Sequence, residues 1–143
     1  MSRKVRVIGV VLLVSVFLSG CFSGGNDKEL IQKVIEGYFA ALNEPNREKA
    51  QKYVLPESAA GEWLAEFFAE KVPLAQKQNV RYEYTFTIRE ITVDTTGREA
   101  QVHLTYTFRV IGYEGLSAPE FEGTFHLTRQ GKQWFLTVAP LAS

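Results

Sequence analysis

The sequence has few of the residues from which metal and catalytic sites are usually built. Its 143 residues include one cysteine and two histidines, His103 and His126. One cysteine excludes an intramolecular disulfide, and the two histidines lack a third ligand at a spacing that suits zinc. Neither a phosphate-binding glycine loop nor a Gly-x-Ser-x-Gly motif is present. We therefore expect no metal and no cofactor.

An excess of basic residues is also lacking. The chain has sixteen Lys and Arg against sixteen Asp and Glu, and three of the cations (Arg3, Lys4 and Arg6) fall in the first 20 residues, which contain no acid. From residue 21 onward, thirteen basic residues therefore face sixteen acidic ones, a net charge of −3. A weakly acidic domain with scattered charges binds nucleic acid poorly, so nucleic acid is not an expected partner.

The longest apolar run is too short for an ordinary membrane-spanning helix. Val7–Leu18 is interrupted only by Gly9 and Ser15, and it has about 12 residues where a bilayer span needs roughly 20. It follows a basic start and precedes small residues, which is typical of a secretory signal peptide. An uncleaved N-terminal membrane anchor is the alternative reading of the same residues.

The end of this run, Leu18-Ser19-Gly20-Cys21, resembles the lipobox of bacterial lipoproteins. The resemblance implies transfer of a diacylglycerol to the Cys21 sulfur, cleavage before Cys21, and acyl chains such as palmitate as a stable membrane anchor. It divides the chain into a signal peptide (1–20), a lipidated cysteine with a short tether (21–27) and a domain (28–143). The expected location is the cell membrane, lipid-anchored on the extracytoplasmic side.

Three helices are expected in the first half of the domain. Apolar residues recur at helical spacing over residues 27–42, and Asn26 precedes them as an N-cap. Asn46 caps a second, short helix over residues 46–54, and a third helix covers residues 57–72. Pro73 is expected to end this third helix because proline lacks the N–H that a helix interior needs.

From about residue 80 the apolar period becomes two, which predicts four strands. Turns at residues 94–97 and 130–132 and a longer loop at residues 111–119 separate them, as in an antiparallel meander. One face is apolar and the other is rich in threonine and charge, so helices cover only one face. The alternation slips at Arg89-Glu90, which predicts a β-bulge that bends the first strand. Four aromatic residues are expected in the core: Phe39, Trp63, Phe67 and Trp134.

This order of elements resembles the NTF2-like superfamily. The segments that carry the resemblance are Tyr38-Phe39-Ala40-Ala41-Leu42-Asn43, then Asn46-Arg47-Glu48-Lys49-Ala50, and the closing Gly131-Lys132-Gln133-Trp134-Phe135-Leu136. The resemblance implies an α+β fold, a cone in which three N-terminal helices pack on the concave face of a curved antiparallel sheet. The superfamily contains isomerases, dehydratases and hydrolases as well as proteins without catalytic activity, so function has to be read from the site.

Few side chains on the expected concave face carry chemistry. Tyr82, Tyr84 and Tyr106 share the apolar face, and with Trp63 they are the expected lining of a ligand-binding pocket; the alternative is that they are core aromatics whose hydroxyls reach the rim. Glu90 is the weak catalytic candidate. Turned inward at the slip it would have a raised pKa and act as an acid or base; the alternative is an exposed side chain beside the bulge.

The isomerases of the superfamily use a catalytic aspartate, and no aspartate here matches it. From residue 21 onward the chain has only Asp27, expected at the start of the first helix, and Asp94, expected in a hairpin turn. Neither is expected to reach the cavity. His103 and His126 both have the parity of the polar face, where a histidine is usually solvated.

Two functions are weighed on these residues. The first is a membrane-anchored extracytoplasmic lipoprotein with a non-catalytic domain that binds a small apolar ligand, a peptide or a membrane-protein partner. The second is a pocket enzyme of the isomerase, dehydratase or hydrolase type that uses Glu90 with a pocket tyrosine. The open sheet face, with rows of threonine around Phe135, is either solvated or the docking face of a homodimer or membrane-protein partner.

We predict that Cys21→Ser abolishes membrane retention, because serine has no sulfur to accept the diacylglycerol. The measurements are palmitate labelling and fractionation of cells that express the full chain. The variant should accumulate as an unprocessed or differently processed precursor. Palmitate labelling of Cys21→Ser, or wild-type processing that is insensitive to globomycin, would contradict the lipobox assignment.

Overall fold

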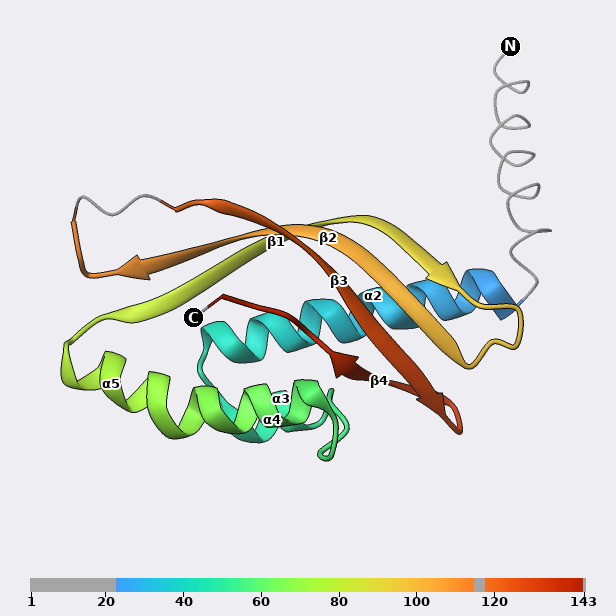
Figure 1. The fold of residues 1–143 in the computed structure, drawn as a ribbon, viewed down its shortest axis with the longest axis horizontal. Coiled ribbons are helices and arrows are strands. Elements are labelled where there is room, and N and C mark those ends of the chain that lie inside the picture. Colours follow the sequence, from blue (N-terminus) through green and yellow to red (C-terminus); the bar gives the residue numbers. More distant parts are fainter. Residues whose placement is uncertain (1–22, 115–117, 143) are drawn as a thin grey trace, which may run out of the picture.

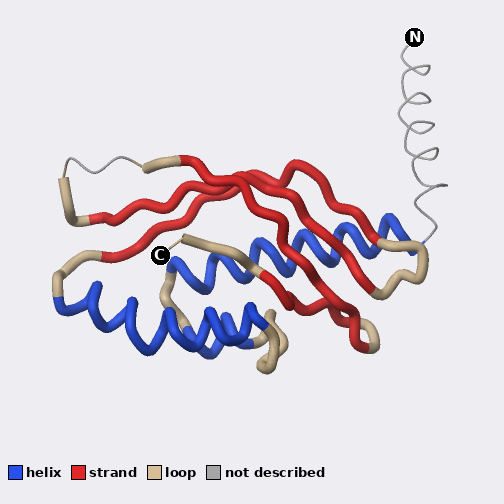
Figure 2. The backbone as a smooth tube through the Cα atoms, in the orientation of Figure 1, coloured by secondary structure: helices blue, strands red, loops and turns tan. Residues whose placement is uncertain are grey.

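The helices form a layer against one face of a single curved sheet (Figure 1). The computed structural model describes residues 23–114 and 118–142, so the signal peptide and the lipobox expected at residues 1–21 lie outside the described residues. Figure 2 shows the helices gathered on one side of the strands, and the expected α+β class is confirmed. Among the described residues, no helix is both long and apolar enough to cross a membrane.

Helix α2 (Ser23–Asn43) starts earlier than the sequence predicts. Residues 23–27, expected in the tether, are helical, and Asn26 lies inside the helix instead of capping it. The reason is a tertiary contact near this end, because Asp27 is buried there and bonded to the sheet. Such a contact stabilises the turns around it more than a local capping signal opposes them. The expected inward stripe is confirmed except at Leu30, which is exposed, and its fully buried members include Ile31, Ile35 and Phe39.

Helix α3 (Arg47–Gln51) has the predicted cap but ends sooner. The Asn46 side chain accepts a hydrogen bond of 3.0 Å from the Lys49 N–H. The chain then leaves the helix because Val54 makes an isolated parallel bridge to Leu136 of the last strand. Backbone bonds on either side of this bridge attach the loop to the sheet edge.

The predicted stop at Pro73 is wrong. The third helical segment runs as α4 (Ala59–Glu66), a π-helical turn η1 (Phe67–Lys71) and α5 (Val72–Lys77), with Pro73 in the first turn of α5. The Val72 N–H bonds back to the Phe67 carbonyl across the widened turn. A π turn is one of the adjustments by which a helix accommodates a residue that cannot complete the regular bonding pattern.

The sheet is the predicted antiparallel meander. Its strands are β1 (Arg81–Val93), β2 (Glu99–Ile111), β3 (Glu120–Gln130) and β4 (Gln133–Val138), paired in that order. The predicted bulge is confirmed: Ile88 pairs with Leu104 and Glu90 with His103, so Arg89 has no partner opposite. The extra residue lets β1 bend while its inward face stays apolar.

The core lies between α2 and the concave face of the sheet. The Phe39 ring stacks on Phe86, with centroids 4.5 Å apart, and on Phe125 at 6.0 Å. Of the four aromatic residues predicted for the core, Phe39, Phe67 and Trp134 are buried and Trp63 is half-buried against it. Such pairs add to the burial of apolar area, which is the main stabilising term of the fold.

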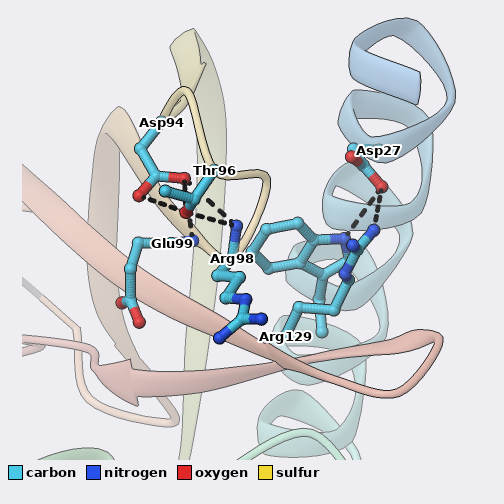
Figure 3. A network of polar contacts seen from close by, with 7 residues as sticks. Asp27, Asp94, Thr96, Arg98, Glu99 and Arg129 are labelled. Atoms are coloured by element: carbon cyan, nitrogen blue, oxygen red, sulfur yellow. Dashed lines mark hydrogen bonds and ion pairs between the residues drawn. The ribbon is translucent and has the colours of Figure 1, made fainter. Parts of the chain in front are cut away.

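A buried carboxylate joins the start of α2 to the last two strands (Figure 3). The Asp27 side chain accepts hydrogen bonds from Trp134 Nε1 at 3.3 Å and from Arg129 Nη1 at 3.4 Å. The Arg129 guanidinium also lies over the Trp134 ring, 5.8 Å from its centroid. Asp27, expected at the start of the first helix, lies inside α2 and closes a polar contact within the fold. Asp94 lies in the predicted hairpin turn, also drawn in Figure 3.

We expect Asp27→Ala to lower the free energy of unfolding by about 1–3 kcal/mol, because it leaves a buried indole N–H without an acceptor. Asp27→Asn keeps an acceptor oxygen and should cost clearly less. Urea unfolding of the full chain, followed by tryptophan fluorescence, measures both. An equal or larger loss for Asp27→Asn would mean that the charge, and not the hydrogen bond, provides the stabilisation.

Candidate binding site at the C-terminal tail

The segment after β4 continues beyond the end of the strand (Figure 1) and packs against the sheet's concave side. We call residues 139–142 the C-terminal tail. Ala139 and Leu141 are buried in the hydrophobic core, while Pro140 is exposed. The tail reaches α4, β1 and β2, and one aromatic side chain from each of these elements bonds to it.

Three aromatic donors bind three successive carbonyls of this tail. The Tyr106 hydroxyl donates to the Pro140 carbonyl at 3.3 Å. Trp63 Nε1 donates to the Leu141 carbonyl at 3.2 Å, and the Tyr84 hydroxyl donates to the Ala142 carbonyl at 2.5 Å. The Tyr106 oxygen in turn accepts the Ala142 N–H at 3.0 Å. The site is therefore a set of neutral donors in an apolar wall, directed at an extended main chain.

Burial keeps these hydroxyls protonated. It raises the pKa of Tyr84 far above the usual tyrosine value. Burial also raises the pKa of Tyr106, against the opposing effect of the hydrogen bond from the Ala142 backbone. A neutral phenol donates a hydrogen bond but does not remove a proton from a ligand near neutral pH.

The structure brings together three of the four residues predicted to line a pocket. Trp63, Tyr84 and Tyr106 meet at the tail, whereas Tyr82 lies nearer the start of β1. Its ring contacts those of Phe67 and Phe108, beside a small cavity of about 40 Å³. The aromatic face is thus largely filled by its own rings and by the tail.

Two features of this region were missed in the sequence. One is the tail itself, for which the only signal was the apolar Leu141 after the last strand. The other is Tyr38 of α2, taken as one more member of an apolar stripe. Its hydroxyl is the one buried side-chain polar atom without a hydrogen-bond partner in the described part of the chain. Burial raises its pKa as well.

Glu90 and the histidines lie on the other face of the sheet. Glu90 is exposed and pairs with His103, and residues directly opposite in a sheet share a face. His103 Nδ1 is 3.5 Å from Thr124 Oγ1 in the next strand. Glu90 is therefore not brought together with the tyrosines of the concave face. Across residues 23–114 and 118–142 there is no group of three side chains suited to hold a metal.

Comparisons with known proteins identify the fold. No protein-family profile matches the sequence, and no curated protein matches it. Among solved structures, an NTF2-like protein of unknown function from Shewanella oneidensis MR-1 is 16% identical, with a TM-score of 0.60 over 77% of this chain and 93% of that one. A conserved protein from Planctomyces limnophilus DSM 3776 is 17% identical, with a TM-score of 0.58 over 79% and 92%.

A third structure, the intermembrane space region of the chloroplast protein ARC6, is 13% identical with a TM-score of 0.51 over 75% of this chain and 89% of that one. At such identities the likeness establishes the fold and nothing about ligands. The chain has an NTF2-like fold, a curved sheet with helices on its concave face, as the sequence predicted.

The raised tyrosine pKa values predict loss of stability in alkali. Unfolding returns the pKa of Tyr84 to about 10. The contribution of un-ionised Tyr84 to the free energy of unfolding is therefore full below pH 10. Above pH 10 this contribution declines, by about 1 kcal/mol between pH 10 and 11. Tyr84→Phe should flatten this decline, and Tyr113→Phe, at an exposed residue, should not. Urea unfolding at pH 9, 10 and 11 compares the three proteins. If the free energy of unfolding fell equally with pH in wild type and in Tyr84→Phe, the burial of an un-ionised Tyr84 would be contradicted.

Proposed function

We propose that this NTF2-like domain is a non-catalytic binding module, held on the extracytoplasmic side of the cell membrane by lipid on Cys21. Its ligand is an extended apolar chain that carries carbonyl groups, such as a peptide. The ligand takes the place of the C-terminal tail. The observation that carries the proposal is the alignment of three aromatic donors with three successive carbonyls.

The donors select main-chain groups, while the surrounding rings select apolar side chains. Trp63 stacks on Phe67 with centroids 4.9 Å apart, and Tyr84 and Tyr106 lie side by side at 6.3 Å. Leu141 is buried among such groups, at 8% exposure. A ligand with small or aliphatic side chains can reproduce these contacts, because carbonyls recur along any peptide.

Binding is favoured over catalysis because, in the part of the chain that the structure describes, the three aromatic donors bond to backbone carbonyls and not to a side-chain carboxylate. The buried carboxylate among the described residues is Asp27, which is paired with Arg129 and Trp134. Glu90, the catalytic candidate, is exposed on the opposite face. A pocket enzyme of the kind first weighed needs a group that changes protonation beside the tyrosines.

The membrane anchor is supported by the lipobox alone, and Cys21→Ser tests it separately. Helix α2 begins at Ser23, two residues after this cysteine. An anchor at Cys21 would therefore hold the domain close to the bilayer. Its ligand or partner would be one that is available at that surface.

Deletion of residues 140–143 should open the aromatic site. We expect the truncated chain to bind a synthetic peptide of residues 139–143, seen as saturable shifts in an NMR titration. The full chain should bind it at least tenfold more weakly, because its own tail competes at an effective concentration of about millimolar or above. Trp63→Phe in the truncated chain removes one donor and should weaken binding about two- to tenfold.

Circular dichroism checks that the truncated chain is folded, and Tyr113→Phe is the matched control for removal of a polar group elsewhere. A folded truncated chain that binds the peptide no better than the full chain would overturn the proposal. If the truncated chain unfolds, amide hydrogen exchange measured in the full chain tests the contact between Tyr106 and the tail instead. There, Tyr106→Phe must speed exchange of the Ala142 amide, and an unchanged rate would overturn the proposed contact.

A further inference from the structure

The inward face of β3 lacks a side chain at one position. Residues of the same parity along this strand, Phe121, Phe125 and Leu127, fill their positions with large apolar groups. Gly123 has this parity too, and it pairs with Leu104, which is fully buried in the core. A glycine inside a strand weakens the strand and often marks a place where another backbone approaches closely. The strand therefore has a gap of one side chain between two phenylalanines.

The C-terminal tail passes over this gap. A Cβ atom added to Gly123 would lie 3.6 Å from the Pro140 carbonyl oxygen and 3.7 Å from Pro140 Cγ. The pairing of β4 with β3 ends at Val138, and the tail then reaches Tyr106 of β2 and Tyr84 of β1. The tail thus runs across the strands, and Pro140 is the residue that lies over β3. A side chain longer than a methyl group at position 123 would meet this proline.

Proline suits this crossing because it brings no N–H. The Tyr106 hydroxyl donates to the Pro140 carbonyl and accepts the Ala142 N–H. Carbonyls and N–H groups of alternate residues lie on one side of an extended chain, and so do the two groups of a single residue. Another residue in place of Pro140 would therefore direct its N–H toward the Tyr106 hydroxyl. It would compete there with the Ala142 N–H or remain without an acceptor.

The residues beside the proline complete a short pattern. Ala139 and Leu141 are buried on either side of the exposed Pro140. The proline ring fixes one backbone angle, so a chain that contains it loses less conformational freedom when it binds. Aromatic walls with hydrogen-bond donors are a recurring means of binding proline-containing segments. The site therefore favours a small residue, a proline and an aliphatic residue in that order.

We infer that the tail site recognises a segment of a partner protein in which a proline is followed by an aliphatic residue, and that Gly123 and Tyr106 form the subsite for the proline. The tail sequence Ala139-Pro140-Leu141 is the template for that segment. The inference rests on the proposed binding of a peptide in place of the tail, and it adds which peptides are bound. It also gives the glycine in β3 a role in specificity.

The first test uses the full chain and its own tail. Pro140→Ala should speed exchange of the Ala142 amide about tenfold, because the tail loses the rigid ring and gains a competing N–H. The matched control is Pro119→Ala, which changes an exposed proline just before β3. The control should stay within about twofold of wild type, as surface substitutions usually do. Hydrogen exchange followed by NMR measures all three proteins.

The second test adds peptides to the full chain that carries Pro140→Ala, whose tail is weakened. Ala-Pro-Leu-Ala-Ser should bind about tenfold more tightly than Ala-Ala-Leu-Ala-Ser in an NMR titration. Adding Gly123→Val to this chain fills the gap and should abolish the preference for the proline peptide. Adding Gly123→Ala should retain it, because the extra Cβ lies at ordinary contact distances. Neither replacement opposes strand formation, since glycine is the weaker strand former.

The outcomes separate this inference from the proposed function. Equal affinity for the two peptides would overturn the inference, and so would unchanged exchange of the Ala142 amide in Pro140→Ala. If the two peptides bound equally and Trp63→Phe weakened both, the tail site would stand and only the preference for proline would be wrong. Saturable binding of neither peptide would overturn the proposed function together with the inference. The peptide comparison retains the native Gly123, so it gives a decision even if Gly123→Val does not fold.

Discussion

The packing of α2 into the concave face of the sheet is the contact on which the rest of the structure depends. The apolar stripe of α2, with Phe39 at its centre, is buried against the rings of β1 and β3. A flat sheet would not wrap around a helix of this length. The bulge at Arg89 lets β1 bend without turning its polar side chains inward, so the helix and the strand remain in contact on both sides of it. A second shift of register, between β3 and β4 at His126 and Leu127, adds to the irregularity of the sheet.

The short last strand determines where the fold is left incomplete. β4 has 6 residues, whereas β1 and β2 have 13 each. Beyond its end, the concave face is covered by the C-terminal tail, whose carbonyls are held by side chains instead of a neighbouring strand. Along its outer edge, the bridge at Val54 covers Leu136. The proposed tail site therefore lies where the C-terminal part of the chain continues past its last strand.

Most of the features that the sequence predicted are local and, apart from the stop at Pro73, those it missed are long-range. Alternation along the strands, the slip at Arg89-Glu90 and the Asn46 cap each depend on neighbours within a few residues, and the structure contains all three. The start of α2 depends instead on a contact between Asp27 and Trp134, 107 residues apart. The tail depends on Trp63, 78 residues before Leu141. The aromatic residues of the site were identified by their parity, but nothing local could indicate that their donors bind the end of the same chain.

The positions of the two tryptophans give the protein a pair of built-in optical probes. Trp63 is half-buried and hydrogen-bonded to the tail, so its emission colour reports whether that carbonyl is in place. Trp134 is 3% exposed, donates a hydrogen bond to the Asp27 carboxylate and lies under the Arg129 guanidinium. With one indole at each place and no other in the sequence, replacing either by phenylalanine leaves a single-emitter protein. Events at the tail and at the buried Asp27 contact can then be followed separately in real time, without a dye.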